Sequence, residues 1–90
     1  MRHAGPEALD RLEDVLSALR AVSALKEKSR GAFYSGGRAF IHFHEHGAAL
    51  YADMRGRDDF DRFDVTTPTQ RAAFLAETHR RLTQATRKRQ

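Results

Sequence analysis

Apolar residues recur every three or four positions in the first third of the chain. They are Leu9, Leu12, Val15, Leu16, Leu19, Val22 and Leu25. This spacing is typical of an amphipathic helix. Pro6 suits a first helical position, and Gly31 can supply a left-handed C-terminal cap after the basic residues Lys26, Lys28 and Arg30. The pattern therefore predicts a helix over about 6–29.

This helix has more length and more apolar width than one small domain needs. It would be about 35 Å long at 1.5 Å per residue, whereas a 90-residue domain has a radius of gyration of about 12 Å. Its large apolar residues cover about 200° of the helical wheel, about twice the stripe that one buried face requires. We therefore predict a homodimer that buries a second surface of the first helix.

The middle of the chain alternates between apolar and polar residues, which predicts strands over 31–34, 38–45 and 48–55. Gly36 and Gly37 form the first hairpin turn, because glycine tolerates a positive φ. A second turn at 46–47 would set Glu45 opposite Ala48, Phe43 opposite Leu50, and Ile41 opposite Ala52.

The second hairpin has two different faces. One is apolar and should form the core under the helices: Ala39, Ile41, Phe43, Leu50, Ala52 and Met54. The other is aromatic and titratable, and should face solvent or a partner: Phe40, His42, His44, Ala49, Tyr51 and Asp53. Since an exposed aromatic patch often marks an interaction surface, we expect binding residues on this second face.

The last third begins with a polar segment, 55–64, in which a short strand or a helical turn inserts Phe60 and Phe63. Thr67 and Gln70 then form a capping box that starts a second helix. Its buried positions would be Phe74, Leu75, Thr78, Leu82 and Ala85. The fold expected is α+β: helix, three- to four-stranded antiparallel meander, helix, with both helices on one sheet face.

Composition fits a single domain of 90 residues, with 40% hydrophobic and 31% charged residues. No apolar run reaches the roughly 18 residues of a membrane helix, so no membrane partner is expected. The absence of cysteine excludes disulfides and favours a reducing, cytoplasmic compartment.

The net charge of +4 lies at one end of the chain. Residues 80–90 hold five basic and no acidic residues out of 16 basic and 12 acidic in total, which leaves 11 and 12 in residues 1–79. Cations at a helix C-terminus, followed by a solvated tail over about 86–90, explain this pattern. The alternative is a contact with nucleic acid or an acidic protein through Arg80, Arg81, Arg87, Lys88 and Arg89.

A histidine cluster is the main candidate for chemistry. His42, His44 and His46 share one face of a strand at a spacing of about 6.5 Å. With Asp53 from the neighbouring strand they could bind zinc or another divalent metal. If the strand ends near Glu45, His46 leaves the row. The alternatives are histidines packed on Phe40 and Tyr51, and another catalytic or pH-sensing role. His3 and His79 are assigned to the helical segments, away from the cluster.

No nucleophile constellation accompanies the histidines. The serines lie on the first helix or in the first turn, and none has a histidine and an acid placed to form a triad. The acidic residues of 58–64 lack the spacing of a calcium loop and indicate a solvated turn. The sequence therefore favours a protein that is not an enzyme.

Two segments resemble a known bacterial family. The run GAFYSGGRAF at 31–40, followed by ALY at 49–51, is similar to the central meander of YjbR-like domains and of the N-terminal domain of TfoX-like regulators. The resemblance covers residues 31 to about 63, with the flanking helices in outline. Those families usually have apolar residues where this chain has His-Phe-His-Glu-His. The resemblance implies an α+β fold and a regulatory or DNA-related role, and it assigns no catalytic residue.

The leading hypothesis is a small interaction or regulatory module, homodimeric and not enzymatic. Two alternatives belong to other classes: a nucleic-acid-binding protein that uses the basic C-terminal segment, and a metal-dependent enzyme that uses the face of His42 and His44.

Overall fold

The computed structural model describes residues 1–88, and side chains as far as residue 84. The elements are β1 (Arg2–His3), α1 (Pro6–Arg11), α2 (Glu13–Arg20), β2 (Lys26–Ser29), β3 (Ala32–Ser35), β4 (Arg38–His46), β5 (Ala49–Arg55), β6 (Phe60–Asp64) and α3 (Pro68–Lys88). The predicted α+β class with an antiparallel sheet is confirmed. No helix among these residues is long and apolar enough to cross a membrane.

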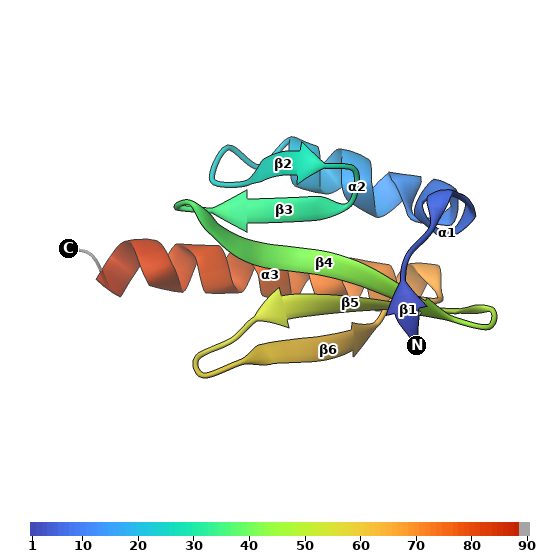
Figure 1. Cartoon of the computed structure of the whole chain (residues 1–90). Coiled ribbons are helices and arrows are strands. Elements are labelled where there is room, and N and C mark those ends of the chain that lie inside the picture. The colour runs from blue at the N-terminus through green and yellow to red at the C-terminus, as the bar shows by residue number, and fades with distance from the viewer. Residues whose placement is uncertain (89–90) are drawn as a thin grey trace.

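The strands form one antiparallel sheet in the order β2-β3-β4-β5-β6, and β1 pairs separately with β4. It has more strands than the three or four expected. Strand β4 is long enough for two neighbours on one edge, because β3 pairs with its first residues and β1 with Glu45 and His44. Helices α2 and α3 lie on the same face of the sheet (Figure 1), as predicted, and the other face is open.

The predicted helix over 6–29 is wrong. The chain is interrupted at Leu12, where φ is −101° and ψ is 10°, and α2 ends at Arg20. Residues Lys26–Ser29 are strand β2 instead. Glu27 stabilises this arrangement, since its carboxylate accepts the Arg20 guanidinium at 2.6 Å and the Gly31 N–H at 2.9 Å. Gly31 does have a positive φ of 82°, but it serves a hairpin turn and not a helix cap.

Because the first helix is neither as long nor as exposed as predicted, the argument for a homodimer no longer holds. Leu12, Val15, Leu16 and Leu19 have no exposed surface, and Leu9 and Leu25 are also buried. The apolar residues of α1 and α2 pack into one core together with residues of the sheet and of α3. The apolar surface that suggested a partner is thus covered by the chain itself, and the homodimer remains an untested prediction.

The β4–β5 hairpin has the predicted faces with a different register. Glu45 pairs with Leu50, Phe43 with Ala52, and Ile41 with Met54. The turn lies one residue later than expected, at Gly47 and Ala48, and Gly47 has a φ of 58°. Each pairing therefore shifts by two residues, and a shift of two leaves the paired side chains of residues 41–46 and 49–54 on their original faces. The apolar face is buried as predicted, with Ala39 only half-buried.

The remaining elements follow the sequence closely. Phe60 and Phe63 lie on a short strand, β6, and Phe63 packs edge-on against Phe74 at 5.6 Å. The capping box at Thr67 and Gln70 is confirmed by reciprocal hydrogen bonds of 3.2 and 2.9 Å. Phe74 and Thr78 are buried, whereas Leu75 and Leu82 are half-buried. The side chain of Ala85 lies outside the described residues.

Candidate metal centre

Two histidines of β4 face each other on the open side of the sheet. His42 and His44 are separated by one residue, so the alternation of the strand places both rings on this face. The Nδ1 atom of His42 lies 3.0 Å from the Nε2 atom of His44. The side chains are 29% and 13% exposed, which leaves them in reach of an ion from solvent.

A third histidine joins them from the N-terminus. His3 pairs with His44 in the β1–β4 ladder, and the two rings stack with centroids 4.7 Å apart. One ring nitrogen from each of His3, His42 and His44 lies within 4.8 Å of the other two. The assignment of His3 to a helical segment was wrong, because the first helix begins only at Pro6. A two-residue strand is too short for any periodicity to reveal it.

Strand β1 is held beside β4 by Glu45. The Glu45 carboxylate accepts the Gly5 N–H at 2.7 Å and the Arg2 guanidinium at 3.3 Å. Both hydrogen bonds lower the pKa of Glu45, and the bond from the Gly5 N–H has the larger effect. The Ala4 N–H also donates to the Phe43 carbonyl at 3.0 Å. Together they place His3 next to His44.

Asp53 lies beside the cluster, as the sequence predicted, but most of its bonding capacity is used elsewhere. Its Oδ2 atom lies 3.2 Å from His44 Nε2 and 4.0 Å from His42 Nδ1. Both oxygens also accept the Arg62 guanidinium, at 2.8 and 2.9 Å. Burial acts to raise the pKa of Asp53, yet Arg62 and the two histidines together bring it below its usual value. Asp53 therefore remains a carboxylate beside the rings.

The environment of His42 favours its neutral form. Burial is the largest effect, and it lowers the pKa of His42. The negative charge of Asp53 acts to raise this pKa, whereas positive charge on His44 or His3 lowers it further. A neutral imidazole keeps the lone pair that a metal ligand must donate. The ring packs against Phe60 of β6, with centroids 4.9 Å apart, and not against Phe40 as one alternative proposed.

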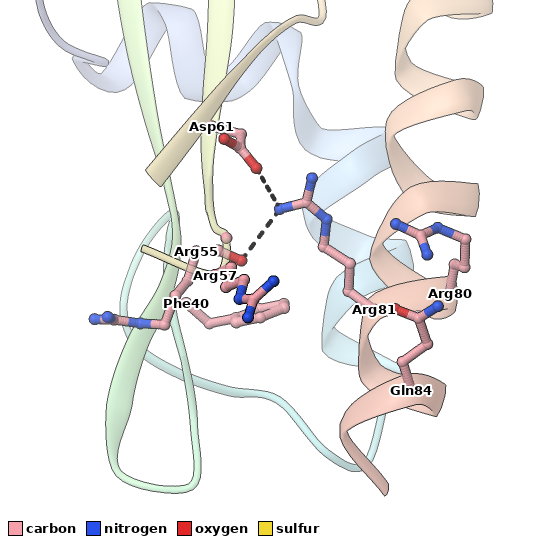
Figure 2. Close-up of a pocket in the computed structure, with 8 residues that line it drawn as sticks. Phe40, Arg55, Arg57, Asp61, Arg80, Arg81 and Gln84 are labelled. Atoms are coloured by element: carbon pink, nitrogen blue, oxygen red, sulfur yellow. Dashed lines mark hydrogen bonds and ion pairs between the residues drawn. The ribbon is translucent and has the colours of Figure 1, made fainter. Parts of the chain in front are cut away.

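The other residues expected on this face are more scattered. Tyr51 lies opposite His44 on β5 and is half-buried. His46 is exposed at the end of β4 and lies outside the three-histidine group. The prediction that Phe40 lies beside His42 is wrong. A register shift between β3 and β4 makes Phe40 an extra residue, and its ring packs against the core on the side of α3 (Figure 2).

Four of the five basic residues predicted to bind nucleic acid, Arg80, Arg81, Arg87 and Lys88, lie on α3. Arg80 is paired with Glu77 at 2.6 Å. Arg81 is paired with Glu77 at 2.7 Å and with Asp61 at 2.8 Å. Arg80 and then Arg81 lower the pKa of Glu77 to about 2. The side chains of Arg87, Lys88 and Arg89 lie outside the described residues.

Comparison with known proteins gives no significant match to any family model, curated protein or solved structure. The similarity to YjbR-like and TfoX-like domains remains a prediction. The geometry of the site is therefore the basis for assigning a function.

Proposed function

We propose that this protein is a small metal-binding module that holds one divalent transition-metal ion, Zn²⁺ above all, through His3, His42 and His44. The observation that carries the proposal is the convergence of ring nitrogens from β1 and β4. Those of His3, His42 and His44 lie within 4.8 Å of one another, and His42 Nδ1 lies 3.0 Å from His44 Nε2. Imidazole is a preferred ligand of Zn²⁺, Cu²⁺ and Ni²⁺, and three histidines with an open position form a recurrent zinc site.

The distances suit a tetrahedral ion after small side-chain rotations. Zinc–nitrogen bonds of 2.0–2.1 Å place two tetrahedral ligands about 3.4 Å apart. The distance of 3.0 Å between His42 Nδ1 and His44 Nε2 is close to this value. The ligand nitrogens of the three histidines all lie within 4.8 Å of one another, so the longer distances must shorten only slightly. Asp53 Oδ2, at 3.2 Å from His44 Nε2, can complete the sphere or hold a bound water.

The hydrogen bonding of the metal-free rings also supports an ion. His42 Nδ1, His44 Nε2 and Asp53 Oδ2 lie within 4.0 Å of one another, and only one proton at a time can lie between the two rings. A divalent cation accepts lone pairs from both rings and neutralises the Asp53 carboxylate as well. The site can therefore make more favourable interactions with a divalent metal ion than with a single shared proton.

The position of the cluster favours binding over catalysis. His3 is exposed, and the rings lie on an open sheet face that no described helix covers. Enzyme sites usually enclose their substrate in a cleft. We therefore propose an interaction or regulatory role, in which metal binding changes the charge and side-chain arrangement of this face, in preference to a metal-dependent enzyme.

Zinc binding to untagged, metal-depleted protein tests the proposal. Calorimetry should give one zinc ion per chain, and His3→Gln, His42→Gln and His44→Gln should each weaken binding at least tenfold. His46→Gln and His79→Gln are matched controls, because both remove an exposed histidine outside the group, and both should leave affinity unchanged. Substoichiometric uptake, or equal losses in controls and cluster variants, would contradict the proposal.

A further inference from the structure

A basic hollow lies on the side of the sheet that α3 covers, apart from the histidines. It has a volume of about 490 Å³ and lies between the end of β5, the turn before β6 and the last turns of α3 (Figure 2). Its lining residues are Phe40, Arg55, Gly56, Arg57, Asp61, Arg80, Arg81 and Gln84. Four arginines and one aspartate line it, and its volume is within the range of small-ligand sites.

Two of the four arginines have structural roles. Arg81 joins α3 to the sheet, since it pairs with Asp61 and Glu77 and donates to the Arg55 carbonyl at 3.2 Å. Arg55 points away from α3 (Figure 2) and lies over Phe60, with its Nε donating to the Ala39 carbonyl. Neither guanidinium is available to a ligand without breaking these contacts.

Of the other two arginines, Arg57 is available, and Arg80 is held by a single described partner that a ligand must displace, Glu77. Among the side chains that the structure describes, none forms a hydrogen bond or ion pair with Arg57, which is exposed on the turn before β6. Arg80 is 54% exposed, and the Glu77 carboxylate accepts two hydrogen bonds from its guanidinium, at 2.7 and 2.6 Å. A phosphate can compete for Arg80, because guanidinium groups bind phosphate oxygens in a bidentate manner.

The remaining lining complements a planar ring. Phe40 is half-buried and supplies an aromatic face beside the arginines (Figure 2), and the Gln84 amide lies exposed at the rim. Bases stack on aromatic side chains, and amides hydrogen-bond to base edges. We propose that this hollow binds one nucleotide unit, with Arg57 and Arg80 on the phosphate and Phe40 under the base.

The unit could come from a free nucleotide or from single-stranded nucleic acid, and two probes separate these sources. A fluorescein-labelled dT12 oligonucleotide is titrated by anisotropy, and AMP is titrated by calorimetry, both in EDTA to keep metal out. Binding of either probe at this site supports the proposal. Binding of AMP alone identifies a free nucleotide as the source, and binding of dT12 identifies the strand.

Variants tie the binding to the hollow. Arg57→Ala and Arg80→Ala should each weaken binding and lower the slope of log K against log salt for dT12 by about 0.7. Phe40→Leu keeps apolar bulk and should weaken binding about fivefold or more by loss of stacking. Arg11→Ala is the matched control, since it removes the same charge next to Ala48 at the β4–β5 turn, and it should have no such effect.

Three results would overturn the proposal. One is failure of both probes to bind. Another is an equal loss in Arg11→Ala and Arg57→Ala, which would show a diffuse charge effect. The third is unchanged affinity in Phe40→Leu together with equal binding of inorganic phosphate, which would show an anion site without a base. Thermal unfolding of each variant confirms that it is folded, and exposed Arg57 keeps the test valid if Phe40→Leu is unstable.

Discussion

At the scale of single residues, Asp53 connects stability to the candidate metal centre. It is 7% exposed and holds Arg62 with both oxygens while it faces His44 and His42. A carboxylate in this position orients the rings and adds negative charge beside the ion. The residue is therefore part of the fold whether or not metal is bound.

Asp53→Asn should lower the free energy of unfolding by about 1–2 kcal/mol, because it replaces a charge-assisted pair with a neutral amide while half-exposed Arg62 returns to solvent. The variant should also bind zinc more weakly. Urea unfolding and calorimetry measure the two effects. Asp58→Asn makes the same chemical change at an exposed turn residue and should alter neither. An unchanged free energy of unfolding in Asp53→Asn would show that the pair with Arg62 contributes nothing to stability.

His42 makes stability depend on pH in a defined direction. Its pKa is below the ordinary 6.5, so between the two values the unfolded chain binds more protons at this residue than the folded protein does. The free energy of unfolding of metal-free protein should therefore fall as the pH decreases from 6.5 towards the pKa of folded His42.

Urea unfolding at a series of pH values from 7.5 to 5.5 measures this dependence. In His42→Gln the contribution of residue 42 should disappear and the curve should flatten. A steeper curve in the variant would be the opposite of the expected sign.

At the scale of elements, β1 supplies the third histidine, and Glu45 positions β1. Glu45→Gln keeps the size of the side chain but weakens its bonds to the Gly5 N–H and Arg2. We expect zinc affinity to decrease and hydrogen exchange at the amides of residues 3–5 to speed up, while global unfolding changes little. Glu7→Gln, at an exposed site on α1, is the control. Weaker zinc binding with unchanged exchange would argue against a positioning role.

The sequence predicts the second half of the chain much better than the first. The capping box at Thr67 and the alternation of β4 and β5 are local signals, and the structure follows them. The apolar spacing of segment 21–29 continues that of α2 and so predicts a helix there. There tertiary pairing with β3 and the contacts of Glu27 override the local pattern.

The candidate site shows the same division between local and distant signals. His42, His44 and Asp53 could be found from strand periodicity alone. His3 could not, because its place depends on a backbone ladder to residues 44 and 45 far along the chain. Gly31 illustrates an intermediate case: its need for a positive φ was readable, whereas the element that requires it was not.

At the scale of the whole molecule, the excess charge and the histidines belong to different surfaces. The histidines lie on the open face of the sheet, and the basic hollow lies on the side of α3. Arg80 and Arg81 are paired with Glu77 and Asp61, so the five basic residues of 80–90 overstate the cations available to a partner. The two proposed sites can therefore be tested separately.

The central claim is that the fold gathers His3, His42 and His44 around one metal ion. Long-range ¹H–¹⁵N NMR of the five histidine rings during a zinc titration tests it most directly, because it reports each ring nitrogen separately. The rings of His3, His42 and His44 should shift together and saturate at one equivalent, while those of His46 and His79 stay unchanged. A titration in which His46 shifts and His3 does not, or in which no ring responds, would contradict the account.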